Sequence, residues 1–332
     1  MNALPERSVA GNGGQGAARV SVVMPVRNNA ETVAQALRSV LAEPEVGEVL
    51  FVDDGSTDGS AEIARGLDDD RVRIVPGPQT GVAAAYSTGY AEARLDYVAI
   101  CDGDDLYRPG RFAWQVGFLD AQPKYVAVVG AYASTDSRLR IYAPLLVDRP
   151  EGDVEDVLRA GEPVSTLCAW LVRRRAVVAL GGRRTWFEVA CDLDYQFRLA
   201  TLGKVRFVPR EAYVYRLREG SVTHANTRAR NAFFTAAARD FARQRALRGS
   251  DDLADGHPPA FQPPALSAKR QAASAQLAGH LLGHAHRARL AGEGAEALRA
   301  ALWALRLDPM RGAAWRTAAA VLAERARGGP KG

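Results

Sequence analysis

The chain has 332 residues, 47% of them hydrophobic and 24% charged, which is typical of a soluble globular protein. No stretch approaches the roughly 18 to 20 consecutive apolar residues of a membrane-spanning helix. Residues 1–18 contain no apolar leader, so we expect a disordered tail there and a cytoplasmic protein. The net charge of +5 could attract phosphate or anionic lipid, but no nucleic-acid-binding motif is present and nucleic acid is not expected as a partner. Three cysteines without C-x-x-C spacing predict neither a disulfide framework nor a zinc site.

Strand and helix signals alternate through the first hundred residues. Apolar runs at 20–26, 48–52, 72–75 and 97–101 predict four strands, and the intervening segments carry helical signals. Repeated units of this kind predict an α/β fold whose mixed, mostly parallel sheet has helices on both faces. Ligands bind such sheets beyond the carboxyl ends of the strands. No dinucleotide-binding G-x-G-x-x-G and no P-loop motif is present, so a bound nucleotide must be held in another way.

Acidic loops follow the second and fourth predicted strands. Asp53 and Asp54 end the second strand, and the run Asp102-Gly103-Asp104-Asp105 follows the fourth. If that run stays extended, Asp102 and Asp104 point to the same side. Hard divalent cations take oxygen ligands, so these two carboxylates are candidate ligands for Mg²⁺ or Mn²⁺. The alternatives are a helix start for the run before Pro109 and Asx-type turns for the first acidic pair.

Three segments resemble the N-terminal landmarks of the family 2 glycosyltransferases. The runs VVMPVRN at 22–28, FVDDGSTD at 51–58 and DGDD at 102–105 match the family in order and spacing. The resemblance implies the GT-A fold over residues 19–227, with a nucleotide-binding half at 19–108 and an acceptor half at 109–227. It implies that the first two loops hold the base and ribose, and that Asp104, with Asp102, meets a divalent metal on the diphosphate. The donor-binding residues expected on this basis are Pro25, Val26, Arg27, Asn28, Asp53, Asp54, Gly81, Asp102, Gly103, Asp104 and Arg216.

One position departs from the family pattern. Members commonly carry an Arg-Asn pair in the helix after the third strand, where this chain has Tyr86 and Ser87. A missing arginine would remove one phosphate or loop contact. Donor affinity or donor type is therefore the property that this departure affects.

The segment 186–199 is similar to the part of the family in which an acidic pair precedes an amphipathic helix. Asp192 matches the catalytic base of the family, while the usual preceding glutamate is Cys191 here. A base on the face opposite the leaving group takes the acceptor hydroxyl proton as the new bond forms, which inverts the anomeric centre. The alternatives are a helix cap for Asp192 and an exposed i,i+4 ion pair for Asp194 with Arg198.

Other side chains in the second half have two interpretations. Trp186 and Phe187 either stack on a sugar ring or belong to the core. Arg216 and His224, in a segment that resembles the end of the family's core, are candidates for diphosphate contacts, although a lone histidine is more often structural.

The pattern changes at residue 228. Residues 228–332 predict a helical extension, with a proline-rich linker near 249–264 and a tetratricopeptide-like hairpin around 298–315. We expect the extension to dock on the catalytic domain. Pairing with a second subunit and peripheral contact with the inner face of a membrane are the alternatives.

The sequence therefore predicts an inverting, metal-dependent glycosyltransferase. It would move a sugar from a nucleotide-diphosphate donor, with a UDP-sugar favoured, to a hydroxyl of a saccharide, lipid-linked or other acceptor. One alternative is a glycosyltransferase-like module that binds the nucleotide sugar without turnover, which Tyr86 and Ser87 would favour. The other is a nucleotidyltransferase with the same acidic metal site. Such an enzyme would need a basic, Gly-rich loop after the first strand to hold a triphosphate, and residues 26–31 contain only one basic residue, Arg27.

Overall fold

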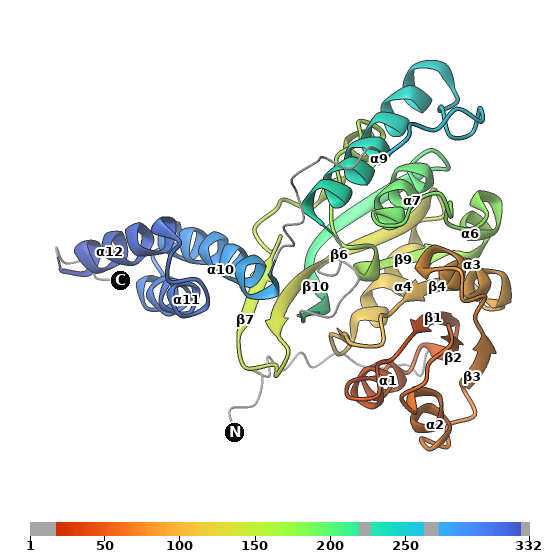
Figure 1. The fold of residues 1–332 in the computed structure, drawn as a ribbon, viewed down its shortest axis with the longest axis horizontal. Coiled ribbons are helices and arrows are strands. Elements are labelled where there is room, and N and C mark those ends of the chain that lie inside the picture. The colour runs from red at the N-terminus through yellow and green to blue at the C-terminus, as the bar shows by residue number, and fades with distance from the viewer. Residues whose placement is uncertain (1–17, 219–226, 262–271, 327–332) are drawn as a thin grey trace.

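The computed structural model describes residues 18–218, 227–261 and 272–326. Within these ranges one sheet forms the centre of the molecule (Figure 1), in the order β3-β2-β1-β4-β9-β6-β10-β5, with β7 on β6 and β8 on β10. The strands are β1 (Val20–Val26), β2 (Val46–Asp53), β3 (Val72–Pro76), β4 (Tyr97–Ile100), β5 (Leu106–Tyr107), β6 (Tyr125–Asp136), β7 (Tyr142–Leu145), β8 (Gly152–Asp153), β9 (Trp170–Arg173) and β10 (Lys204–Leu217). The helices are α1 (Val33–Leu41), α2 (Ser60–Arg65), α3 (Val82–Glu92), α4 (Arg111–Ala121), α5 (Glu155–Arg159), η1 (Leu167–Ala169), α6 (Arg174–Leu180), α7 (Cys191–Leu199), α9 (Arg228–Arg248), α10 (Ala273–Leu290), α11 (Gly294–Leu307) and α12 (Gly312–Ala326).

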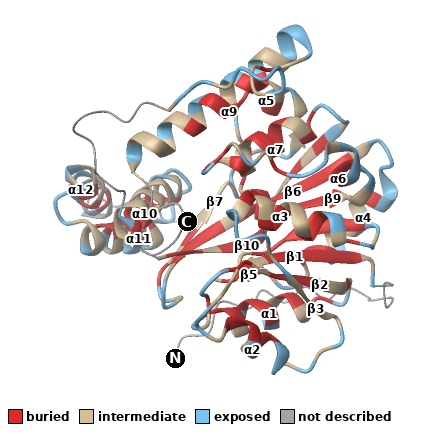
Figure 2. Cartoon of the chain, turned by 45° about the vertical axis from the view of Figure 1, so that its right-hand side comes forward, coloured by how far each residue is buried: buried red, intermediate tan, exposed pale blue. Residues whose placement is uncertain are grey.

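The N-terminal half is the parallel part of the sheet. Strand β1 runs parallel to β2 and β4, and β2 runs parallel to β3. Strands β1 and β4 and most of β2 are apolar and buried, as expected of a sheet covered on both faces (Figure 2), whereas the edge strand β3 is only partly buried. Helix α3 lies close on β1 because Gly89 has no side chain there, and a Cβ would overlap Val23 Cγ1. The arrangement brings the carboxyl ends of β1, β2 and β4 to one edge.

The C-terminal half makes the sheet mixed, as predicted. Strand β9 runs antiparallel between β4 and β6, whereas β6 and the long β10 are parallel to each other. The apolar run at 166–172 predicts one strand, but residues 167–169 form the 3₁₀ helix η1 and the strand β9 begins only at Trp170. The buried Arg111 donates to the carbonyls of Cys168 and Trp170, and Gln115 donates to that of Ala169. These side chains satisfy backbone groups that a strand would pair with its neighbours.

Helix α9, which the sequence assigned to the C-terminal extension, packs on the main core. Its apolar side, which includes Phe234 and Phe241, is buried in the main core. Trp186 and Phe187 pack against those two rings, so they belong to the core. Asp251, in the expected linker, pairs with Arg184 and Arg245. Packing with the main core therefore continues past residue 228.

The last three described helices form a unit that projects from one side of the sheet (Figure 1). Ile141, Ala143 and Leu217, at the ends of β7 and β10, share an apolar cluster with the helical residues Leu277 and Leu281. Docking of these helices on the main domain, the interpretation favoured by the sequence, is therefore seen in the structure. Among the residues described, no helix is both long and apolar enough to cross a membrane.

Candidate active site

The loops after β1 and β2 are hydrogen-bonded to each other. Asn28 Oδ1 accepts from the backbone N–H of Thr57 at 2.9 Å, and Asp58 accepts from the N–H of Ala30 at 2.8 Å. Of the expected donor residues in the first loop, Arg27 and Asn28 are exposed, Pro25 is half-buried and Val26 is buried. The two loops therefore form one connected surface, as their position after adjacent parallel strands predicts.

Asp53 and Asp54 are fixed by backbone groups. Asp53 Oδ1 accepts from the N–H of Ser56 at 2.9 Å, and Asp54 Oδ1 accepts from the N–H of Gln79 at 2.6 Å. The contact of Asp53 is the local turn that the sequence offered as the alternative, whereas Asp54 holds the loop after β3. Further along that loop, the exposed Gly81 begins α3 with a φ of 110°. The role of these residues in holding a nucleoside remains a prediction.

The acidic run after β4 turns instead of staying extended. The N–H of Asp105 donates to the carbonyl of Asp102 at 3.1 Å, so the chain reverses through Gly103 and Asp104. Asp105 is fully buried and accepts from the hydroxyl of Tyr213 at 2.7 Å and the N–H of Arg216 at 2.6 Å. Burial, followed by the charge of Asp104, raises the pKa of Asp105 well above its usual value. Asp105 therefore serves the structure of the loop.

None of the carboxylates of this run caps the helix that follows. Helix α4 begins at Arg111, and its first N–H groups are bound from another element. Glu43 accepts from the N–H of Gly110 at 2.7 Å and from that of Phe112 at 3.2 Å. The interpretation of the acidic run as a helix start is therefore wrong, and Asp102 and Asp104 are available for other contacts.

Asp102 lies on the inner side of the acidic loop. Its Oδ1 accepts a hydrogen bond from the hydroxyl of Tyr86, and its Oδ2 lies 3.7 Å from Cys168 Sγ. Burial, followed by the charge of Asp104, raises the pKa of Asp102 to about 6. Asp104 is partly exposed, and its Oδ2 pairs with Arg218 Nε at 2.5 Å.

The two carboxylates fit a divalent ion in their chemistry. Both offer oxygen donors, and the charge of Asp104 raises the pKa of Asp102, a repulsion that a cation would relieve. Within the described ranges, no group of three or more His, Cys, Asp or Glu side chains gathers as a ready-made metal site. A site of this kind would need oxygen ligands from a substrate or water to complete its coordination, as magnesium sites often do.

Arg216 does not meet the acidic loop with its guanidinium. The side chain is 5% exposed and donates to Gln35 Oε1 at 2.7 Å and to the carbonyl of Ser137 at 3.4 Å. The cation on the acidic loop is Arg218, which the sequence analysis missed. Arg218 directly follows the end of β10, and no local pattern distinguishes it from the other arginines of this segment. His224 lies outside the residues that the structure describes.

Helix α7 carries two carboxylates in different environments. The helix begins at Cys191 after Ala190, which has a φ of 60°, so Asp192 lies in the first turn and is not the cap. Its partly exposed carboxylate makes no hydrogen bond or ion pair with any described residue. Asp194 is fully buried between Arg184 and Arg198. The expected i,i+4 pair with Arg198 is therefore present, but it is buried and not exposed.

Arg183 connects the start of α7 with the acidic loop. Its guanidinium carbon lies 3.3 Å from the centroid of the Tyr86 ring, and Tyr86 in turn donates to Asp102. On the other side, Arg183 Nη1 lies 3.5 Å from Cys191 Sγ. The residue before Asp192 is thus joined to Asp102 through two side chains. Arg183 could not be predicted as a site residue, since nothing in the local sequence distinguishes it from its neighbour Arg184.

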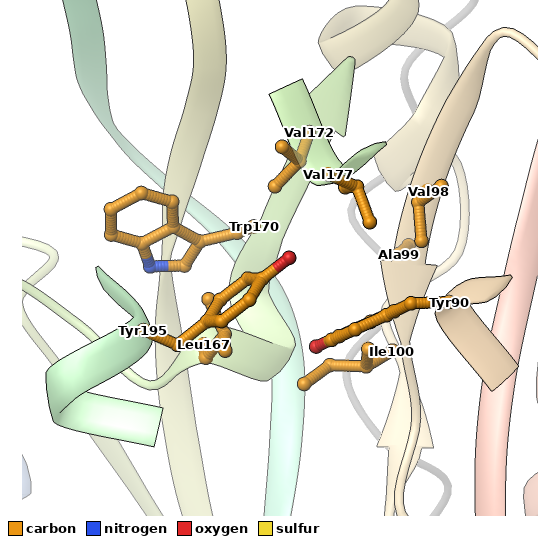
Figure 3. Close-up of a pocket in the computed structure, with 9 residues that line it drawn as sticks. All are labelled: Tyr90, Val98, Ala99, Ile100, Leu167, Trp170, Val172, Val177 and Tyr195. Atoms are coloured by element: carbon orange, nitrogen blue, oxygen red, sulfur yellow. The ribbon is translucent and has the colours of Figure 1, made fainter. Parts of the chain in front are cut away.

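Two hollows of the described chain lie near α7 and α9. A small, mostly apolar space of about 10 Å³ lies between α3, β4, β9 and α7, and Tyr90 and Tyr195 reach toward it (Figure 3). It holds one water at most. An open cleft of about 670 Å³ separates α9 from the C-terminal helices and is lined by Arg228, Asn231, Ala232, Thr235, Ala275, Asp308 and Arg311. Neither space is lined by the expected donor residues.

The fold and the acidic loops define a GT-A type of domain. Residues 1–349 of TarS from S. aureus, in complex with UDP-GlcNAc, superpose with a TM-score of 0.55 at 15% identity, covering 95% of this chain and 93% of TarS. The mannosyltransferase PcManGT from Pyrobaculum calidifontis, in complex with GDP-Man and Mn²⁺, gives a TM-score of 0.52 at 21% identity, with 92% and 80% covered. At these identities the likeness shows the fold.

The family follows from the sequence comparison. Residues 21–181 match the model of Glycosyl transferase family 2, so the chain carries a domain of that family. The succinoglycan biosynthesis protein ExoU of Rhizobium meliloti (strain 1021) is 41% identical over 95 residues, which are 28% of each protein. ExoO of the same organism is 28% identical over 219 residues, 61% of this chain and 62% of the relative. The matches thus span less than two thirds of these relatives.

Proposed function

We propose that this chain is an inverting glycosyltransferase that moves a sugar from a nucleotide diphosphate, with a UDP-sugar favoured, to an acceptor hydroxyl. The acceptor would be a saccharide, a lipid-linked sugar or another alcohol. The family domain supports the reaction class. The nucleotide sugars bound by TarS and by PcManGT support the donor class.

One observation carries the proposal. Arg183 contacts both Tyr86, which binds Asp102, and Cys191, which precedes Asp192. A transferase needs the leaving diphosphate and the attacking hydroxyl on opposite faces of one sugar. The contacts of Arg183 support such a juxtaposition of the two acidic groups.

The donor would bind along the carboxyl edge of β1, β2 and β4. Asp53 and Asp54 would read the nucleoside, because a carboxylate can accept the imide N–H of uracil. Asp102 and Asp104 would hold Mg²⁺ or Mn²⁺, which when bound supplies positive charge against the departing diphosphate.

Asp192 would be the base. Its carboxylate, which is free of partners among the described residues, would take the proton of the acceptor hydroxyl. The acceptor oxygen then bonds to the anomeric carbon while the bond from that carbon to the diphosphate breaks. Attack from the opposite face leaves the anomeric centre inverted.

Thermal unfolding with nucleoside diphosphates and nucleotide sugars, in Mn²⁺ or in EDTA, tests the donor site. A ligand at a hundredfold its dissociation constant adds about 2.7 kcal/mol to the free energy of unfolding. That is a shift of about 5 to 10 °C for a domain of this size. We expect one nucleotide to shift the wild type in Mn²⁺ alone and Asp104→Ala to abolish that shift. The exposed Asp70→Ala is the matched control. Absence of any nucleotide-dependent shift would refute the proposal.

A further inference from the structure

Arg183 is a buried cation whose hydrogen bonds go to neutral groups. The side chain is 6% exposed. Its Nε and Nη2 donate to the hydroxyl of Tyr90 at 3.3 and 3.2 Å, and Nη1 faces Cys191 Sγ. No carboxylate of the described chain is hydrogen-bonded to it. A buried charge without a direct counter-ion is costly, so its retention here calls for a reason other than stability.

The loop that carries Arg183 is fastened to α3. The N–H of Arg183 donates to Ser87 Oγ at 2.9 Å. The preceding residue is Gly182, where a Cβ would overlap the same Ser87 side chain. These contacts bring the guanidinium over the neighbouring Tyr86 ring, whose electron-rich face attracts a cation.

Tyr86 has the Asp102 carboxylate as its partner. The tyrosine is 3% exposed, and its hydroxyl donates to Asp102 Oδ1. The N–H of Asp102 is bound separately, to the hydroxyl of Tyr213 at 3.1 Å. The tyrosine therefore controls the rotation of the carboxyl group, whereas Tyr213 holds the backbone of the same residue.

We propose that Tyr86 and Arg183 are positioning residues for Asp102. The guanidinium holds the Tyr86 ring in place. The hydroxyl of that ring orients the Asp102 carboxylate so that its unoccupied lone pairs face the nucleotide-sugar donor. The inference rests on the proposed function, in which Asp102 meets the ion and the donor diphosphate. Because the same guanidinium touches Cys191, it also fixes the distance between the acidic loop and the start of α7.

The test compares two buried tyrosines that differ in the partner of their hydroxyl. Tyr86→Phe keeps the ring under Arg183 and removes the hydrogen bond to Asp102. Tyr195→Phe is the matched control, because Tyr195 is 1% exposed and its hydroxyl has no partner among the described residues. Calorimetry measures the affinity for UDP, GDP and dTDP in Mn²⁺ and in EDTA. We expect Tyr86→Phe to weaken the Mn²⁺-dependent binding about tenfold, as loss of a hydrogen bond to a charged group does, and Tyr195→Phe to leave it within about twofold.

A double-mutant cycle tests whether Arg183 acts through Tyr86. Arg183→Met should weaken Mn²⁺-dependent binding as Tyr86→Phe does, and the two together should weaken it less than the product of the single effects. Arg183→Lys, which keeps the charge without the planar stack, should recover part of the loss. With an identified donor, the KM for that donor should rise more than the kcat falls.

The outcomes separate the two claims. Equal affinities for Tyr86→Phe and Tyr195→Phe, in a protein that binds a nucleotide with Mn²⁺, would overturn the positioning role and leave the proposed function intact. Multiplicative losses in the cycle would show that Arg183 does not act through Tyr86. If the wild type binds none of the three nucleotides, the proposed function fails and this inference fails with it.

Discussion

Arg218 Nε lies 2.5 Å from Oδ2 of Asp104, so the acidic loop already has a cation on one of its carboxylates. The pair is partly buried, with 28% of the arginine side chain and 13% of the aspartate side chain exposed. A guanidinium and a divalent ion placed on the same carboxylate compete for its charge.

Removal of that guanidinium should strengthen metal binding. For Arg218→Gln we expect the affinity for Mn²⁺ alone, measured by calorimetry without nucleotide, to rise about two- to fivefold, which corresponds to the free energy of up to about 1 kcal/mol that a partly exposed ion pair contributes. Arg65→Gln removes the same charge from an exposed pair with Glu62 and is the control. An equal gain in both variants would mean that net charge, and not competition at Asp104, sets the affinity.

Two carboxylates two positions apart in α7 should respond differently to the same substitution. Asp192→Asn should lower the transfer rate by about 10² to 10⁴, the usual worth of a general base, and leave nucleotide affinity and the unfolding midpoint unchanged. Asp194→Asn should instead lower the free energy of unfolding by about 3 kcal/mol or more, because Arg184 and Arg198 lose a buried partner. Rates of sugar transfer and urea unfolding of both variants distinguish the roles. A folded Asp192→Asn with normal turnover would remove this residue as the base.

Two helical glycines should also differ. Gly89→Ala should lower the free energy of unfolding by about 1 to 3 kcal/mol, because the new methyl group overlaps Val23 where α3 packs on β1. Gly117→Ala, in α4, meets nothing within 4 Å and should stabilise the protein by about 0.5 to 1 kcal/mol through helix propensity. Chemical denaturation measures both values. Similar effects at the two sites would contradict the close approach of α3 to the sheet.

Docking of the C-terminal helices should weaken in acid. Burial, followed by the charge of Arg287, lowers the pKa of His280 to about 4, and its Nδ1 lies 2.9 Å from Ser134 Oγ in β6. The unfolded histidine takes up its proton near pH 6.5, while the folded one resists protonation down to about pH 4. The contribution of neutral His280 to the free energy of unfolding is therefore fully present above about pH 6.5 and is lost as the pH falls from there to about 4.

The measurement is the pH dependence of unfolding. His280→Gln should flatten the profile between pH 6.5 and pH 4, the two ends set by the ordinary and the shifted pKa. The exposed His286→Gln should leave it unchanged. The same slope in the His280 variant and the wild type would place the acid sensitivity elsewhere.

Local patterns were sufficient for much of the fold. The apolar runs predicted β1 to β4, and the expected helical content after residue 228 is seen in α9 to α12. The loops that follow adjacent strands were correctly expected to lie together. The 3₁₀ helix η1 was missed because its backbone groups are bound by Arg111, whose position over Cys168 no local pattern reports.

The parts of the site that escaped the sequence depend on long-range contacts. The structural role of Asp105 could not be predicted from the run DGDD, because its partner Tyr213 lies in β10. Tyr86 looked like a loss relative to the family, whereas it binds Asp102 and carries Arg183 on its ring. Neither partner is near in the sequence, so spacing alone could not reveal them.

The apolar cluster under α10 has a practical consequence for dividing the protein. A chain shortened to end at residue 261 would uncover Ile141, Ala143 and Leu217, which are at most 4% exposed in the intact molecule. Because Leu217 is adjacent to Arg218 in the sequence, the newly exposed apolar surface would border the arginine that pairs with Asp104. Without the C-terminal helices the main domain would therefore expose apolar surface, which those helices cover at the far end of the sheet.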